Sequence, residues 1–161
     1  MTERSRRSVL KDALAAAFVG GCLVVACALA GVPSWIAFVV WTSYALFGNT
    51  AKQGLKMFGS YLVGVVVGFG ASAIILLLTG AGLPALVGSV IAFGLAIFLL
   101  SLLEDTPPLD DIPAYFLGAI TFFATGQAAG LPAFAMIAGA GALGLGAGWA
   151  TVRAQNLLKR S

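Results

Sequence analysis

Residues 32–51, VPSWIAFVVWTSYALFGNTA, decide the fold of this chain. The stretch contains no charged residue, and a helix needs about twenty apolar residues to cross the hydrocarbon layer of a membrane. Its middle nevertheless carries polar and aromatic side chains: Trp41, Thr42, Ser43 and Tyr44. The stretch therefore predicts a membrane-spanning helix that holds polar and aromatic groups at membrane depth.

A second stretch, IPAYFLGAITFFATGQAAGL at residues 112–131, has the same plan. Pro113 matches Pro33 at a separation of 80 positions. With a short gap, Ser43-Tyr44 matches Thr121-Phe122, and Gly48-Asn49 matches Gly126-Gln127. We interpret this pair of stretches as the working centre of the protein.

The composition is that of an integral membrane protein. The 161 residues are 60% hydrophobic and only 9% charged, whereas soluble domains carry about 25% charged residues. We therefore expect one membrane domain over residues 1–161, with the lipid bilayer as its main partner. The net charge of +3 does not indicate nucleic acid, because the basic residues lie at the ends of the apolar segments.

Six apolar segments follow one another, at residues 13–30, 32–51, 57–79, 84–103, 112–127 and 132–151. Lipid cannot satisfy open backbone groups, and the segments lack the alternation of barrel strands, so we expect six transmembrane helices in an all-α fold. With cytoplasmic tails at residues 1–11 and 152–161, all nine Lys and Arg fall on the inner side. Arg6-Arg7 also allows a cleaved twin-arginine signal, which the apolar remainder of the chain disfavours.

Several small residues recur after 80 positions: Gly64 matches Gly144, and Gly68 matches Gly148. Halves at about residues 12–82 and 83–155 would each hold three helices and enter the membrane from opposite sides. This predicts two inverted repeats with a solute path at their interface; the alternative is chance, since glycine is common in membrane helices. We expect these glycines to pack helices within one subunit, and contacts in a homo-oligomer are the alternative.

The second and fifth segments hold the candidate pore-lining residues: Trp41, Thr42, Ser43, Tyr44, Asn49, Thr121, Phe122, Thr125 and Gln127. Hydroxyls and amides can replace part of the hydration shell of a small solute, and aromatic rings can form constrictions. Two alternatives stand beside this. Trp35, Tyr115 and Trp149 suit anchoring at the headgroups, and Ser and Thr often bond to their own helix backbone.

The six apolar segments contain no Asp, Glu, Lys, Arg or His, which disfavours proton relays, ion coupling and voltage sensing. The chain has no histidine, no metal-ligand spacing and no phosphate loop, so we expect neither an enzyme nor a cofactor. Cys22 and Cys27 diverge on one helix and are not expected to pair. In the acidic loop at residues 104–111 we expect a solvated hairpin, with Asp111 capping the fifth helix, rather than a metal site.

The runs PSWIAFVVWTSYALFG and IPAYFLGAITFFA, together with the six-segment layout, resemble a family of small bacterial inner-membrane proteins, domain of unknown function 1097. The resemblance covers most of the chain and implies a bacterial inner-membrane location. It carries no substrate and no catalytic residue. The layout is also similar in plan to aquaporins and formate channels, but the chain lacks the paired Asn-Pro-Ala motifs of the former and the central histidine of the latter.

We therefore expect a channel or facilitator for a small, uncharged solute, lined by the second and fifth segments. Bulky substitutions at Ser43 or Thr121 would then block flux without unfolding the protein. The alternative is a non-transporting accessory subunit that packs against another membrane protein through its glycine stripes.

Overall fold

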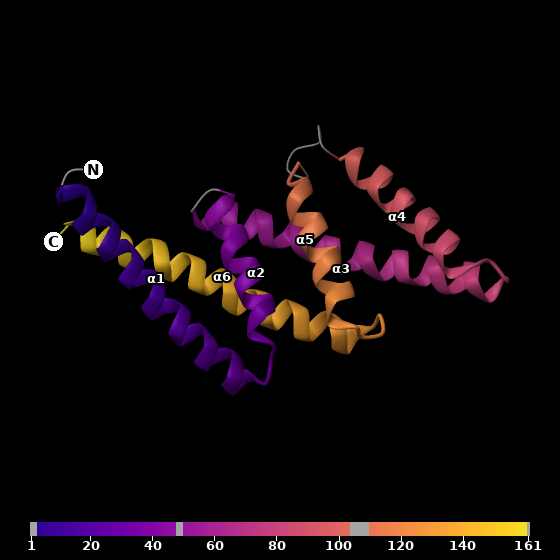
Figure 1. Ribbon diagram of the computed structural model, residues 1–161, viewed down its shortest axis with the longest axis horizontal. Helices are drawn as coiled ribbons and strands as arrows, with labels where there is room; N and C mark the ends of the chain where they lie inside the picture. Colours follow the sequence, from indigo (N-terminus) through magenta and orange to yellow (C-terminus); the bar gives the residue numbers. More distant parts are fainter. Residues whose placement is uncertain (1–2, 48–49, 104–109, 161) are drawn as a thin grey trace. The chain divides into compact units, whose positions relative to one another are not determined.

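The structure is a computed structural model that describes residues 3–47, 50–103 and 110–160. Within these residues every regular element is an α-helix, as the sequence predicts (Figure 1). The helices are α1 (Glu3–Ala30), α2 (Ser34–Leu46), α3 (Ala51–Gly80), α4 (Ala85–Ser101), α5 (Ile112–Thr125) and α6 (Leu131–Arg160). Each predicted segment therefore corresponds to one helix.

The helices differ in length. Three long apolar stretches meet the requirement for a membrane span: Ser8–Ala30, Ala51–Gly80 and Leu131–Lys159. The other three are apolar but shorter, with 17 residues in α4, 14 in α5 and 13 in α2. At 1.5 Å per residue, α2 and α5 are each about 20 Å long. The long apolar helices make the chain a multi-pass membrane protein.

The helix α2 is shorter than the apolar run that predicts it. Pro33 lacks an N–H and adopts an extended conformation, so the helix begins at Ser34. Phe47 closes the other end, where its N–H donates to the carbonyl oxygen of Ser43 at 3.0 Å. The continuous helix expected over residues 32–51 is therefore confined to its first two thirds.

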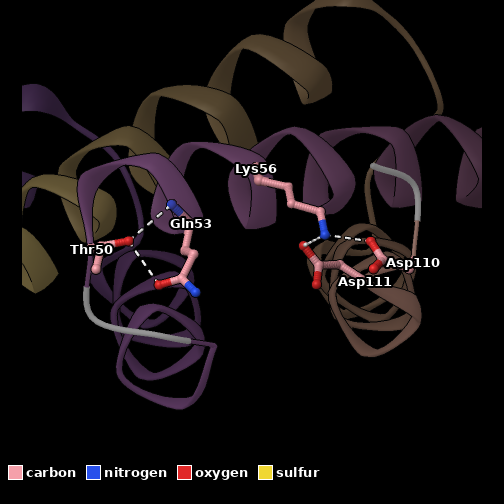
Figure 2. Close-up of polar contacts among 5 residues, drawn as sticks. All are labelled: Thr50, Gln53, Lys56, Asp110 and Asp111. Atoms are coloured by element: carbon pink, nitrogen blue, oxygen red, sulfur yellow. Dashed lines mark hydrogen bonds and ion pairs between the residues drawn. The ribbon is translucent and has the colours of Figure 1, made fainter. Parts of the chain in front are cut away.

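Lys52 and Lys56 lie in the first turns of α3, although both fall between the apolar segments at residues 32–51 and 57–79. The cause is a capping arrangement at Thr50 (Figure 2). Its hydroxyl accepts a hydrogen bond from the backbone N–H of Gln53 at 3.3 Å and donates to the Gln53 side chain at 2.7 Å. A Thr-x-x-Gln pattern of this kind starts a helix, so α3 begins at Ala51.

The turns after α1 and α3 are built alike. Gly31 and Gly82 have φ of 65° and 92°, a region that glycine enters without steric cost. The residue after each glycine donates to the carbonyl oxygen five positions earlier, Val32 to Cys27 and Leu83 to Leu78, both at 3.0 Å. This is the Schellman pattern of helix termination, and a proline follows each time. Local sequence therefore defines both turns.

The chain divides into two compact units. Unit 1 contains Met1–Leu55 and Gly139–Ser161, which is α1, α2 and most of α6. Unit 2 contains Lys56–Ala138, which is most of α3 with α4 and α5. These units do not coincide with the halves expected at residues 12–82 and 83–155. The helix α3, the third of the first expected half, belongs to unit 2 with α4 and α5. The helix α6, the third of the second expected half, belongs to unit 1 with α1 and α2.

In unit 1, α2 crosses α6 at two glycines (Figure 1). A Cβ added at Gly144 would lie 3.0 Å from the Cα of Ala37 and closer still to its carbonyl oxygen. One turn further, a Cβ at Gly148 would lie 2.6 Å from the Tyr44 ring. Only residues without a side chain allow the two backbones to approach so closely.

In unit 2, α5 crosses α3 in the same way (Figure 1). A Cβ at Gly64 would lie 2.8 Å from the Cα of Tyr115, and one at Gly68 would lie 2.9 Å from the Phe122 ring. All four glycines predicted to pack helices therefore make their close contacts within a unit.

The buried faces of α2 and α5 also have identical spacing. The buried residues of α2 are Ile36, Ala37, Val40, Ser43 and Tyr44, and the buried residues of α5 are Ala114, Tyr115, Gly118, Thr121 and Phe122. Every member of the second set lies 78 positions after its counterpart.

Candidate functional site

Unit 1 contains a cavity of about 370 Å³ between α1, α2 and α6. Its side of α2 presents Phe38, Trp41, Thr42, Tyr44 and Ala45. The remaining lining comes from Ala16 of α1 and from Gly148, Thr151, Val152 and Gln155 of α6. A volume of this size is within the range of small-molecule pockets, about 300–1,000 Å³.

The aromatic wall of the cavity is positioned by glycines. Trp41 packs against Phe38 with ring centroids 5.5 Å apart, and a Cβ added at Gly20 of α1 would lie 3.2 Å from the indole ring. Tyr44 is only 2% exposed because its ring lies against Gly148 and Gly54. Small residues on α1, α3 and α6 therefore set the orientation of both rings.

The opposite wall carries polar groups one helical turn apart on α6. The Thr151 hydroxyl is buried and donates to the carbonyl oxygen of Ala147 at 2.8 Å. The side chain of Gln155 donates to the backbone carbonyl of Asp12 at 3.3 Å, which joins α6 to α1. Nearby, Lys159 Nζ lies 3.3 Å from the Asp12 carboxylate. These polar contacts hold the first part of α1 against the last part of α6. The sequence predicts both of these ends to be cytoplasmic.

The chemistry of the lining is mostly apolar, with a few hydroxyl and amide groups and the Trp41 N–H. Tyr44 is the single titratable residue among the ten that line the cavity. In small-molecule sites with such a lining, apolar walls provide most of the contact and a few polar groups fix the orientation.

The structure distributes the predicted pore-lining residues over both units. Trp41, Thr42 and Tyr44 line the unit 1 cavity, and Thr121 and Phe122 lie in the core of unit 2. Phe122 contacts Phe69 edge-on with ring centroids 4.6 Å apart. Asn49 lies outside the described residues.

Several predicted hydroxyl and amide groups bond locally instead. Ser43 and Thr121 are each 1% exposed and donate to backbone carbonyls of their own helices. Thr125 donates to the Phe122 carbonyl at 2.7 Å, and Gln127 contacts the Met136 sulfur at 3.4 Å. The hydroxyls of Ser43, Thr121 and Thr125 therefore bond to the backbone of their own helices, which is the alternative to pore lining that the sequence leaves open.

A family model described as Protein of unknown function (DUF1097) matches residues 13–157. The chain belongs to this family. The resemblance seen in the two aromatic runs is thereby confirmed over nearly the whole chain. No curated protein matches, and no solved structure matches.

In this DUF1097 chain the acidic loop is described only from Asp110 onward. Lys56 forms ion pairs with Asp110 and Asp111, the latter at 3.7 Å, which joins the start of α3 to the start of α5 (Figure 2). The hydrogen bond from Lys56 lowers the pKa of Asp110 below its ordinary value. Asp111 occupies the N-cap position of α5 as predicted, but its side chain makes no capping bond.

Metal-binding groups are not found among the described residues, where no three His, Cys, Asp or Glu side chains gather. Cys22 and Cys27 are both free, as their spacing predicts. Of the three proposed headgroup anchors, Trp35 and Trp149 are exposed, but Tyr115 is fully buried between α3 and α5. Tyr115 therefore serves the interior of unit 2.

Sequence reasoning missed the α6 side of the cavity in this family member. Thr151 and Gln155 fall at the end of the last segment and in the following tail, where polarity suggests a solvated extension. The signal that could have found them is their spacing: Gly148, Thr151 and Gln155 recur at three and four positions, which is one face of a helix.

Proposed function

We propose that this DUF1097 chain is a bacterial inner-membrane facilitator that lets a small, largely uncharged solute cross the membrane, and that the solute binds in the unit 1 cavity. The observation that carries the proposal is the cavity itself. It combines apolar walls with hydroxyl and amide groups from two helices, and its lining carries no Asp, Glu, Lys or Arg.

We also propose that the chain consists of two inverted three-helix repeats. Three separate features support it: the shared spacing of the buried faces of α2 and α5, the matching glycine crossings, and the matching lengths of α3 and α6, 30 residues each. The crossing of Gly64 with Tyr115 has its counterpart in the crossing of Gly144 with Ala37. Gly144 lies 80 positions after Gly64, and Tyr115 lies 78 positions after Ala37. These are the offsets that relate α3 to α6 and α2 to α5.

In this arrangement the two repeats meet inside each unit, because each unit takes its third helix from the other repeat. The unit 1 cavity then lies at an interface of the repeats, between α1 and α2 of the first and α6 of the second. Transporters built from inverted repeats bind their solutes at such interfaces.

The two units are not equivalent at this place, which favours unit 1 as the binding unit. Ala45 lines the cavity, and its counterpart 78 positions later is Phe123. Phe123 packs against Phe93 and Phe122, with ring centroids 5.1 Å apart in both pairs. Aromatic rings therefore occupy in unit 2 the region that a methyl group borders in unit 1.

The test is permeation through proteoliposomes, followed by stopped-flow light scattering with water, glycerol, urea, ammonia and formate. We expect saturable permeation of one uncharged member above the rate of empty vesicles. Ala45→Phe should abolish it, because the added ring would occupy the cavity that Ala45 lines.

Leu46→Phe is the matched control, since Leu46 is 71% exposed and does not line the cavity. Equal flux through the wild type and a folded Ala45→Phe variant would exclude the cavity as the path. Flat traces for the whole panel from folded protein would favour the accessory-subunit alternative. A partner would then need a surface other than the four packing glycines, which are occupied within the chain.

A further inference from the structure

Unit 2 contains two buried tyrosine hydroxyls without a hydrogen-bond partner. Tyr61 on α3 and Tyr115 on α5 are both 0% exposed. Among the described residues, neither hydroxyl has a donor or acceptor in hydrogen-bonding geometry. Neither residue belongs to the cavity or to the predicted pore-lining set.

The two tyrosines occupy reciprocal places at the crossing of α3 and α5. Gly64 of α3 lies against the backbone of Tyr115, and Gly118 of α5 lies against the backbone of Tyr61. A Cβ at Gly118 would lie 2.9 Å from the backbone nitrogen of Val65. Close backbone contact on both sides fixes where the two tyrosine side chains begin, so they cannot easily turn outward.

Thr121 is a polar side chain beside Tyr61, but it does not satisfy the Tyr61 hydroxyl. Thr121 lies close enough to influence the Tyr61 hydroxyl, but the contact falls outside hydrogen-bonding geometry. The Thr121 hydroxyl donates its own proton to the carbonyl oxygen of Leu117 at 2.7 Å. Thr121 therefore retains acceptor capacity and faces a phenol that has an unused proton.

An unpaired buried hydroxyl is costly, and nearly all such groups in native proteins are paired with protein or with ordered water. The cost is greater in a membrane, where no bulk solvent can relieve it. Phenylalanine would fill the same space without that cost, and the chain uses it at 11 positions. The unpaired Tyr61 hydroxyl beside Thr121 therefore indicates a bound polar partner.

We propose that the crossing of α3 and α5 binds a water-sized molecule that both donates and accepts hydrogen bonds, held by the Tyr61 hydroxyl beside Thr121. Water and ammonia share this chemistry. The molecule accepts the phenol proton and donates to the free lone pairs of Thr121, which satisfies both groups at once. Position 141 of α6, the counterpart of Tyr61 at the offset of 80, is glycine, so the site belongs to unit 2 alone.

The first test is X-ray radiolytic footprinting of the full chain in lipid nanodiscs, read by mass spectrometry. Radicals formed from a bound water oxidise the side chain next to it. Tyr61 should be oxidised several-fold faster than Phe122, which is also buried in the same unit, at 2% exposed, but has no hydroxyl. Added ammonia that slows the oxidation of Tyr61 identifies ammonia as a ligand, and an unchanged rate identifies water.

The second test is thermal unfolding of Tyr61→Phe, a substitution that keeps the ring. A bound molecule predicts a lower Tm and slower oxidation around Thr121. The proposal is overturned if Tyr61 is oxidised no faster than Phe122 and Tyr61→Phe leaves the Tm unchanged or raises it. It is also overturned if Tyr61 stays unlabelled while Tyr61→Phe and Thr121→Val have non-additive effects on Tm, because the two side chains then bond to each other directly.

Discussion

Ser43 on α2 and Thr121 on α5 make the same hydrogen bond in their two helices. The Ser43 hydroxyl donates to the carbonyl oxygen of Val39 at 2.8 Å, and the Thr121 hydroxyl donates to that of Leu117 at 2.7 Å. Both side chains are 1% exposed. Neither hydroxyl faces the unit 1 cavity, although the sequence makes both of them pore-lining candidates.

This pair leads to a prediction for Ser43. Ser43→Ala should leave solute flux unchanged and should alter the free energy of unfolding by no more than about 1.5 kcal/mol, because the lost bond is local. Ser43→Trp should lower the Tm sharply, since a buried serine site has no room for an indole ring. Thermal unfolding and flux of both variants check this. A folded Ser43→Trp protein with blocked flux would instead support the pore-lining position that the sequence suggests.

The glycine crossings predict a contrast within each long helix. Gly64→Ala and Gly144→Ala should destabilise the protein by about 1–3 kcal/mol or more, because the added methyl group meets backbone atoms that cannot move aside. Gly70→Ala and Gly146→Ala are the matched controls, since a Cβ there meets nothing within 4 Å. Their better helix propensity should raise stability by up to about 1 kcal/mol. Equal Tm values for the two classes would contradict the close crossings.

The ion pairs of Lys56 predict a pH dependence. The folded pKa of Asp110 is below its ordinary value of 3.8, so the pair contributes stability above that value and loses it as pH falls through the folded pKa. Asp110→Asn should therefore lower the Tm at neutral pH, and the difference from wild type should disappear in strong acid. Salt should also reduce the difference, because both side chains are accessible to solvent. A Tm difference that persists below the folded pKa would assign the effect to packing.

The charge distribution predicts the orientation of the helices. A cysteine at position 81, in the uncharged turn after α3, should react with an impermeant maleimide added outside intact spheroplasts. A cysteine at position 52 should react only after the membrane is opened, because the basic ends are predicted to be cytoplasmic. Both variants require Cys22 and Cys27 to be replaced first. Labelling of position 52 from outside would reverse the proposed topology.

The helical content and the six segments follow from the sequence, because they depend on local properties. Long uncharged runs require backbone groups to be satisfied within a helix, and Gly31 with Pro33 or Gly82 with Pro84 end and restart helices by short-range bonds. The family match over residues 13–157 agrees with the resemblance of the two aromatic runs.

Position along the chain is less informative about which residues form the cavity. Trp41, Thr42 and Tyr44 line it together with Thr151 and Gln155, more than a hundred residues away in the sequence. Ser43, in the middle of the same polar run, turns to its own backbone. Ser43 lies within one helical turn of the residues that line the cavity. Only the packing of the neighbouring helices decides which side of α2 faces the cavity.

The sequence by itself determined that this is a membrane protein whose described residues form six helices, because apolar length and turn chemistry act within a few residues. The tertiary structure alone decided that α6 packs with α1 and α2, and α3 with α4 and α5. That choice depends on whether Gly144 and Gly64 find a backbone that fits against them, and such complementarity exists only between segments far apart in the chain.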